Sequence, residues 1–137
     1  MDPAQPSQDP VQHRASCLCG AVRIMVRGDL PAPSACHCTI CRKHTGHFEV
    51  STDVPKDRVQ VEGEEHITWY RSSEKVRRGF CSICGSSLLF DPPHRDWIAI
   101  SMGAFDTPTG VKLAGHIFVA DKGDYYELTD GLPQNAQ

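Results

Sequence analysis

The chain has 137 residues, enough for one domain with a modest core, and its apolar content of 39% and aromatic content of 7% are lean for that size. A net charge of -3 gives no indication of the basic patch or stripe that binds nucleic acid. No apolar run approaches the ~20 residues of a membrane span. We therefore expect neither a nucleic-acid nor a membrane partner.

The N-terminal residues 1–13 are rich in Pro, Gln, Ser and Asp, which predicts a flexible tail before a single domain at 14–137. This segment lacks the basic and hydrophobic regions of a secretory signal, so the expected compartment is the cytoplasm. Cysteines stay reduced there, and the odd number of seven fits disulfides poorly. Metal ligation is therefore the better interpretation of the cysteines.

Short strands dominate the pattern from residue 21 onward. Val22, Ile24 and Val26 alternate with other residues and predict a strand with one apolar face. Further strands are predicted around 48–50, 59–61, 66–70, 75–80, 86–90 and 97–102, the last apolar enough to be central. A hairpin of 116–120 and 125–128 is expected to close the chain. About nine strands, with at most one or two helical turns after Cys41, predict a mainly β sandwich or folded sheet.

Three cysteines lie within six residues: Cys36, Cys38 and Cys41. Thiolates are soft ligands that zinc binds in a tetrahedral set, and the C-x-x-C spacing lets two sulfurs converge on one ion. Three sulfurs leave the fourth position unassigned. Because catalytic zinc keeps one position open and structural zinc does not, we hypothesise a zinc ion here with one reactive vacancy.

The segment Cys81–Gly85 predicts a zinc knuckle, in which Gly85 tolerates the left-handed backbone of the turn. A knuckle supplies two ligands, and two pairings can complete it. In the first, Cys17 and Cys19 join Cys81 and Cys84, which leaves the Cys36 triplet as a separate open site. In the second, Cys38 and Cys41 join the knuckle as a simple zinc ribbon, which leaves three thiols without a role.

In these motifs the chain resembles the glutathione-dependent formaldehyde-activating enzyme family. The likeness covers roughly residues 14–130, and the combined seven-cysteine pattern is specific. The matching segments are 17–22, 36–43, 78–88 and 116–119. A late aromatic position that is often Trp in the family is Tyr125 or Tyr126 here.

The resemblance implies a β-tent-type fold of small layered antiparallel sheets held by two zinc ions. It implies a structural zinc at Cys17, Cys19, Cys81 and Cys84, and a catalytic zinc at Cys36, Cys38 and Cys41. The family reaction joins glutathione to formaldehyde as S-hydroxymethylglutathione. We therefore expect a zinc-dependent carbon–sulfur lyase or synthase acting on a thiol–aldehyde adduct. The alternatives are a non-catalytic zinc-binding interaction module and a zinc enzyme of this fold with another small-molecule substrate.

Several polar residues near the cysteines are candidates for supporting roles. His37 could be a fourth ligand or a proton shuttle, or could simply pack. His44 and His47 could act as general acid or base, and Arg42 and Lys43 could hold glutathione carboxylates. Alternation along a strand places Arg77 and Arg78 on opposite faces, so at most one of them should point toward a metal.

Overall fold

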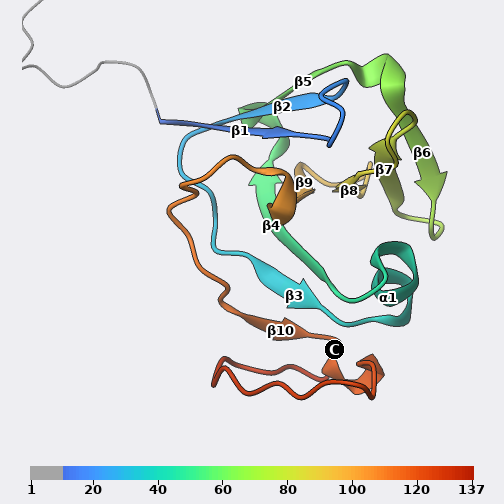
Figure 1. Ribbon diagram of the computed structural model, residues 1–137, viewed down its shortest axis with the longest axis vertical. Helices are drawn as coiled ribbons and strands as arrows, with labels where there is room; N and C mark the ends of the chain where they lie inside the picture. Colours follow the sequence, from blue (N-terminus) through green and yellow to red (C-terminus); the bar gives the residue numbers. More distant parts are fainter. Residues whose placement is uncertain (1–10) are drawn as a thin grey trace, which may run out of the picture.

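Ten short strands, one α-helix and four 3-10 turns make up the part of the chain that the structure, a computed structural model, describes, residues 11–137 (Figure 1). The strands are β1 (Gln12–Ser16), β2 (Arg23–Arg27), β3 (Ser34–Cys36), β4 (Glu49–Pro55), β5 (Val59–Glu62), β6 (Ile67–Arg71), β7 (Arg77–Cys81), β8 (Ser87–Asp91), β9 (Trp97–Ser101) and β10 (Gly115–Ile117). The helix is α1 (Thr39–Thr45), and the 3-10 turns are η1 (Lys56–Arg58), η2 (Glu64–His66), η3 (Met102–Ala104) and η4 (Val119–Asp121). Most of the expected tail lies outside the described residues, and its last two positions, Gln12 and His13, belong to β1.

The strands form two sheets, as the mainly β prediction requires. The smaller sheet has the antiparallel order β1-β2-β5, and the larger has the order β10-β3-β4-β9-β8-β7-β6. The expected central strand is confirmed, because β9 is the fourth of the seven strands and its residues 98–100 are buried. The larger sheet is mixed rather than wholly antiparallel, since β10 runs parallel to β3.

The core lies between the two sheets. The apolar face predicted for β2 is buried, with Ile24 at 2% and Val26 at 0% exposure. It belongs to the same hydrophobic cluster as Val54 of β4, Leu88 of β8 and Ile100 of β9. The opposite face of β4 and β9 is therefore free to line a cavity, because side chains alternate along a strand.

The helix α1 is short, and a capping residue defines each of its two ends. Cys38 caps the N-terminus by accepting a hydrogen bond from the Cys41 backbone N–H, and Gly46 ends the helix in the left-handed region at φ 89°. The helix begins at Thr39, before Cys41 rather than after it as predicted, because the cap is a cysteine of the triplet itself. Within residues 11–137, no helix is long and apolar enough to cross a membrane.

The predicted closing hairpin is wrong. Residues 119–121 form η4, and residues 125–128 are in no strand. The His116 N–H donates to the Pro133 carbonyl at 2.9 Å, and the Asn135 N–H donates to the His116 carbonyl at 2.9 Å. Phe118 then leaves the extended conformation, with φ 55°. The backbone groups that a hairpin would need are thus taken by β3 on one side and by residues 133–135 on the other.

Candidate metal centres and the adjoining cavity

Two loops that are distant in sequence bring four sulfurs together. Cys17 and Cys19 lie between β1 and β2, while Cys81 ends β7 and Cys84 lies before β8. The Cys17 and Cys19 sulfurs are 3.6 Å apart, and those of Cys19 and Cys81 are 3.8 Å apart. All four lie within 4.8 Å of one another. This is the grouping of the first pairing, and the zinc-ribbon pairing does not occur.

The local turns explain how each sulfur pair converges. A hydrogen bond from Gly20 N–H to the Cys17 carbonyl closes a turn, with Gly20 at φ 82°. This brings the C-x-C sulfurs closer than the 6–7 Å that strand rise alone would give. In the knuckle, Gly85 has φ 80°, and the N–H groups of Ile83 and Cys84 each point at the Cys81 sulfur at 3.4 Å. Both turns predispose their sulfurs to bind a cation.

The donor set of this four-cysteine cluster fits zinc. Four sulfurs at a Zn–S distance of ~2.3 Å in a tetrahedron would be ~3.8 Å apart, close to the observed separations. The Ser86 hydroxyl lies 3.2 Å from the Cys84 sulfur and accepts the Leu18 N–H at 2.9 Å. Several hydrogen bonds, of which the one from the Ser86 hydroxyl has the largest effect, lower the pKa of Cys84 to about 5 and so favour the thiolate form that metals bind. With four protein ligands, such a site would be closed.

The second, three-cysteine cluster comes from a single stretch of chain. Cys36 ends β3, Cys38 caps α1, and Cys41 lies in the first turn of that helix. Their sulfurs also lie within 4.8 Å of one another. Three soft thiolates fit zinc as a donor set, and no fourth His, Cys, Asp or Glu of the described chain joins them.

Arg78 lies directly against this cluster. Both terminal nitrogens of its guanidinium are 3.6 Å from the Cys41 sulfur, its Nε donates to the Ser72 hydroxyl at 3.1 Å, and the residue is 5% exposed. Arg77 points the other way, stacks on Trp69 at 3.8 Å and pairs with Asp91 at 2.8 Å. The opposite-face prediction is confirmed, and Arg78 is the arginine on the metal side.

The thiols of the triplet do not ionise alike. A hydrogen bond with Cys41 lowers the pKa of Cys36, because it stabilises the Cys36 thiolate. The same interaction, together with burial, raises the pKa of Cys41. The positive charge of Arg78 opposes that rise. Of these two thiols, Cys36 is therefore the one that ionises first.

A cavity of about 330 Å³ opens beside the triplet. All three cysteines line it, together with alternating residues of β4 and β9. Glu49, Ser51 and Asp53 come from β4, and Trp97 and Ala99 come from β9. The cavity is therefore the unburied face of these two central strands, closed at one end by the cysteines.

Two carboxyl groups in this cavity were missed by the sequence reasoning. Glu49 accepts a hydrogen bond from the Ser101 hydroxyl at 2.6 Å, and burial raises its pKa, against the effects of Ser101 and Arg78. Burial also raises the pKa of Asp53. The sequence signal that could have revealed them was the alternation of polar and apolar residues in this strand, whose polar face was assigned no role.

His37 is buried away from the triplet sulfurs. One ring nitrogen lies 2.9 Å from His116 Nδ1, and the other is hydrogen-bonded to the Tyr126 hydroxyl. His116 Nε2 in turn pairs with Asp130 at 2.8 Å. Both nitrogens of His37 are thus occupied, and the residue ties the loop between Cys36 and Cys38 to the C-terminal segment.

The remaining candidates lie around the cluster rather than in it. His44 Nε2 is 3.1 Å from the Ser87 hydroxyl, and burial with the nearby Arg78 charge lowers its pKa. His47 is hydrogen-bonded to the Tyr125 hydroxyl, and Arg42 donates to the Asp121 carbonyl at 3.0 Å. Lys43 is exposed. Of these four residues, none lines the cavity beside the triplet.

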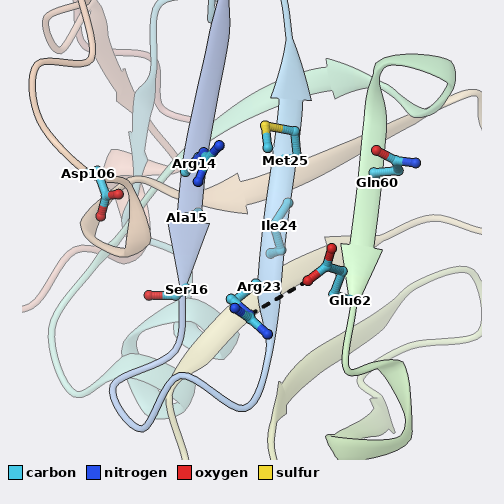
Figure 2. Close-up of a pocket in the computed structure, with 9 residues that line it drawn as sticks. All are labelled: Arg14, Ala15, Ser16, Arg23, Ile24, Met25, Gln60, Glu62 and Asp106. Atoms are coloured by element: carbon cyan, nitrogen blue, oxygen red, sulfur yellow. Dashed lines mark ion pairs between the residues drawn. The ribbon is translucent and has the colours of Figure 1, made fainter.

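A second cavity, of about 390 Å³, lies over the smaller sheet (Figure 2). Its side chains come mainly from β1, β2 and β5, and Arg23 pairs with Glu62 across it at 3.7 Å. It contains neither a cysteine nor a histidine. Of these two cavities, the first is the one lined by cysteines.

Fold and site together define a small β-rich protein with two thiolate clusters suited to metal binding, one of four cysteines and one of three. The family described as glutathione-dependent formaldehyde-activating enzyme matches residues 12–121. The chain belongs to this family.

This chain is similar to two relatives and to one solved structure. A Halomonas elongata protein, provisionally assigned as a glutathione-dependent formaldehyde-activating enzyme, is 32% identical over 124 residues, which cover 82% of this chain and 78% of the relative. An uncharacterized lyase of Schizosaccharomyces pombe is 24% identical over 120 residues, 87% of each chain. A crystal structure of a Rhodobacter sphaeroides protein superposes with a TM-score of 0.59 at 20% identity, over 74% of this chain and 99% of that one, and supports the fold.

Proposed function

We propose that this protein is a zinc-dependent carbon–sulfur lyase or synthase that acts on a thiol–aldehyde adduct of the S-hydroxymethylglutathione kind. One observation carries the proposal. The three-cysteine cluster borders a cavity of about 330 Å³, whereas the four-cysteine cluster has a full set of sulfur ligands. A ligand set that is one short, beside a space for a small molecule, is the arrangement of a catalytic metal site.

Two zinc ions are proposed. Cys17, Cys19, Cys81 and Cys84 would hold a structural ion, and Cys36, Cys38 and Cys41 would hold a catalytic one. Zinc bound at the second site would favour ionisation of a thiol, which as a free group of pKa ~8.5 is only slightly ionised at neutral pH. Arg78 would hold the Cys41 sulfur in place through its two donors and balance part of the thiolate charge.

The reaction is an addition that needs no oxidant or reductant. The C–S bond forms as the carbonyl π bond breaks, and the proton leaves sulfur and arrives on the former carbonyl oxygen; the lyase direction reverses this. Glu49 is the cavity carboxyl placed to carry that proton, because Ser101 fixes its Oε1 and burial raises its pKa toward neutrality. Bringing thiol and aldehyde together in the cavity adds the advantage of proximity.

Glutathione and formaldehyde are the first substrates to test, because the Halomonas elongata relative carries both in its description. We place the reaction in the cytoplasm. All seven cysteines are free thiols and are arranged as metal ligands rather than disulfides, which suits a reducing compartment.

The test combines a metal count with NMR exchange between formaldehyde and its thiol adduct. The unaltered chain should bind two zinc ions and accelerate exchange. Cys36→Ser should bind one, keep its fold, and lose the acceleration. Thr39→Ser, an exposed change on the same helix that leaves every sulfur in place, is the matched control and should behave as the unaltered chain.

The outcomes separate the alternatives. Full exchange activity in Cys36→Ser would reject the catalytic role of the triplet. Two zinc ions with no acceleration by any thiol would favour a non-catalytic module or a different substrate. Because the catalytic ion is expected to be labile, the count is made with zinc in excess, and a single bound zinc under that condition would remove the proposed catalytic centre.

A further inference from the structure

His37 occupies the junction between the two elements that carry the triplet. It follows Cys36, which ends β3, and it precedes Cys38, which caps α1. The strand β3 is held between β10 and β4 in the larger sheet, and the chain turns into α1 just beyond it (Figure 1). The spacing of the three sulfurs therefore depends on how residue 37 joins the strand to the helix.

The ring of His37 is held at both of its nitrogens. The residue is 0% exposed, with one nitrogen 2.9 Å from His116 Nδ1 and the other hydrogen-bonded to the Tyr126 hydroxyl. Phe48 packs on the ring, with the two centroids 4.7 Å apart. The backbone is held as well, because the His37 N–H donates to the Ile117 carbonyl at 3.0 Å. The residue cannot turn without leaving buried polar groups unpaired, which is unfavourable.

The hydrogen bonds around His37 have one consistent order. The hydrogen bond from His116 lowers the pKa of Asp130, and an ionised carboxylate only accepts, so His116 carries its proton on Nε2, 2.8 Å from Asp130. Both rings are buried, which favours the neutral imidazole with one donor and one acceptor nitrogen. His116 Nδ1 therefore accepts from His37 Nε2. His37 Nδ1 in turn accepts from the Tyr126 hydroxyl, so every donor in the chain from Tyr126 to Asp130 has an acceptor.

We propose that Tyr126, His116 and Asp130 are positioning residues of the three-cysteine site. Acting through His37, they hold the end of β3 and the start of α1 in the relation that brings the sulfurs together. The proposal rests on the proposed function, because it takes the triplet to be the catalytic metal site. Zinc would bind more tightly to ligands that are already in place, since ordering side chains and loops costs binding free energy.

Two neighbouring tyrosines provide a matched pair of variants. Tyr126→Phe keeps the ring that stacks on His37 and removes only the hydroxyl donor. Tyr125→Phe makes the same change at a residue that is 62% exposed and hydrogen-bonded to His47, outside the triplet. Chelator titration of the zinc-loaded full chain should show that Tyr126→Phe lowers the zinc affinity of the triplet by about three- to tenfold, the size expected for one lost hydrogen bond. Tyr125→Phe should leave it unchanged, and equal affinities in the two variants would overturn the proposal.

The four-cysteine site serves as an internal reference in the same titration. A general loss of stability would lower the zinc affinity of both sites, because metal binding is coupled to folding. Tyr126→Phe should instead lower the affinity of the triplet alone. A parallel loss at both sites would overturn the positioning role and leave Tyr126 as a residue that only stabilises the fold.

The other end of the hydrogen-bond chain is tested by rescue. Asp130→Leu removes the acceptor for His116, whereas Asp130→Asn retains an oxygen that can accept. Because the Asp130 side chain is 40% exposed, the leucine variant should lower the zinc affinity of the triplet by only about two- to fivefold. The asparagine variant should restore most of that loss. An equal loss in both variants, or none in the leucine variant, would overturn the role of Asp130.

Nitrogen-15 NMR of the histidine side chains reads the order of the protons directly. At about pH 8, above the usual pKa of imidazole, His37 should carry its proton on Nε2. Its Nε2 should show a coupling to His116 Nδ1 across the hydrogen bond, and this coupling should persist in Tyr125→Phe. A proton on His37 Nδ1 would overturn the proposed order.

Failure of this inference can be told apart from failure of the proposed function. A selective loss of triplet affinity in Tyr126→Phe, with no thiol supporting formaldehyde exchange in the unaltered chain, would sustain the positioning role and reject the lyase reaction. Rapid exchange with glutathione in the unaltered chain, with the same triplet affinity in both tyrosine variants, would sustain the reaction and reject the positioning role.

Discussion

The two cysteine clusters are made of the same ligand type, yet they are built in different ways. The four-cysteine cluster joins loops whose cysteines Cys19 and Cys81 are 62 residues apart, next to a core in which Cys17 and Cys81 are buried. The three-cysteine cluster needs only the end of β3 and the first turn of α1. A metal bound at the first site would cross-link the fold, whereas one at the second would not. Position in the chain, as well as ligand count, would thus separate the structural role from the catalytic role that we propose for the two clusters.

Removing a sulfur from the four-cysteine cluster should have the largest effect. Cys81 has no exposed surface, and Cys81→Ser would weaken the metal link between the two loops. Because metal binding at such sites is coupled to folding, we expect a loss of several kcal/mol, comparable to the whole stability of a small domain. Circular dichroism should show no cooperative thermal transition, whereas Cys36→Ser should retain one. Similar thermal midpoints for the two variants would contradict the division of roles.

Replacing Arg78, the arginine beside the triplet, should have the next largest effect, a loss of zinc affinity at that cluster. Arg78→Met keeps the buried volume but removes both donors to the Cys41 sulfur. Partners of metal ligands typically contribute about 10–100-fold to affinity, so zinc should leave this site at a correspondingly lower chelator concentration. The four-cysteine site should be unaffected. Arg77→Met is the matched control, because that side chain stacks on Trp69 on the other face, and it should leave both affinities unchanged.

A smaller effect is expected where the C-terminal segment holds the triplet loop. His116→Asn would leave the buried His37 Nε2 without its partner at 2.9 Å, and a buried polar group that loses its hydrogen bond costs about 1–3 kcal/mol. Chemical denaturation should show this loss, and the zinc affinity of the triplet should fall with it. His13→Asn, at a half-buried position of β1 where the side chain has no hydrogen-bond partner among the described residues, is a control for the substitution itself. Unchanged zinc affinity in His116→Asn would show that His37 merely packs.

The smallest effect should come from the surface of the four-cysteine cluster. Leu18 lies between two of its cysteines but is 89% exposed. Leu18→Ser should therefore change stability by no more than about 0.5 kcal/mol and leave the metal count at two. A larger loss in thermal denaturation would mean that this exposed side chain is covered by something in solution.

Much of the fold could be predicted from local pattern. The alternation of Val22, Ile24 and Val26 placed β2, and the apolar run at 97–100 placed β9 in the middle of the larger sheet. Such patterns report burial, which each strand reveals by itself. The end of the chain could not be predicted in this way. The apolar run 116–120 suggested a hairpin, but its partners are β3 and residues 133–135, and only a global arrangement determines those pairings.

The sequence by itself determined the two sets of cysteines, because ligand type and C-x-C or C-x-x-C spacing are local properties that a turn converts directly into converging sulfurs. Tertiary structure decided which sets share a site, that Arg78 lies against Cys41, and that Glu49 and Asp53 face the same space as the triplet. Those relations depend on which strands become neighbours in the larger sheet. Strand order reflects the packing of the whole core, so no single stretch of the chain encodes it.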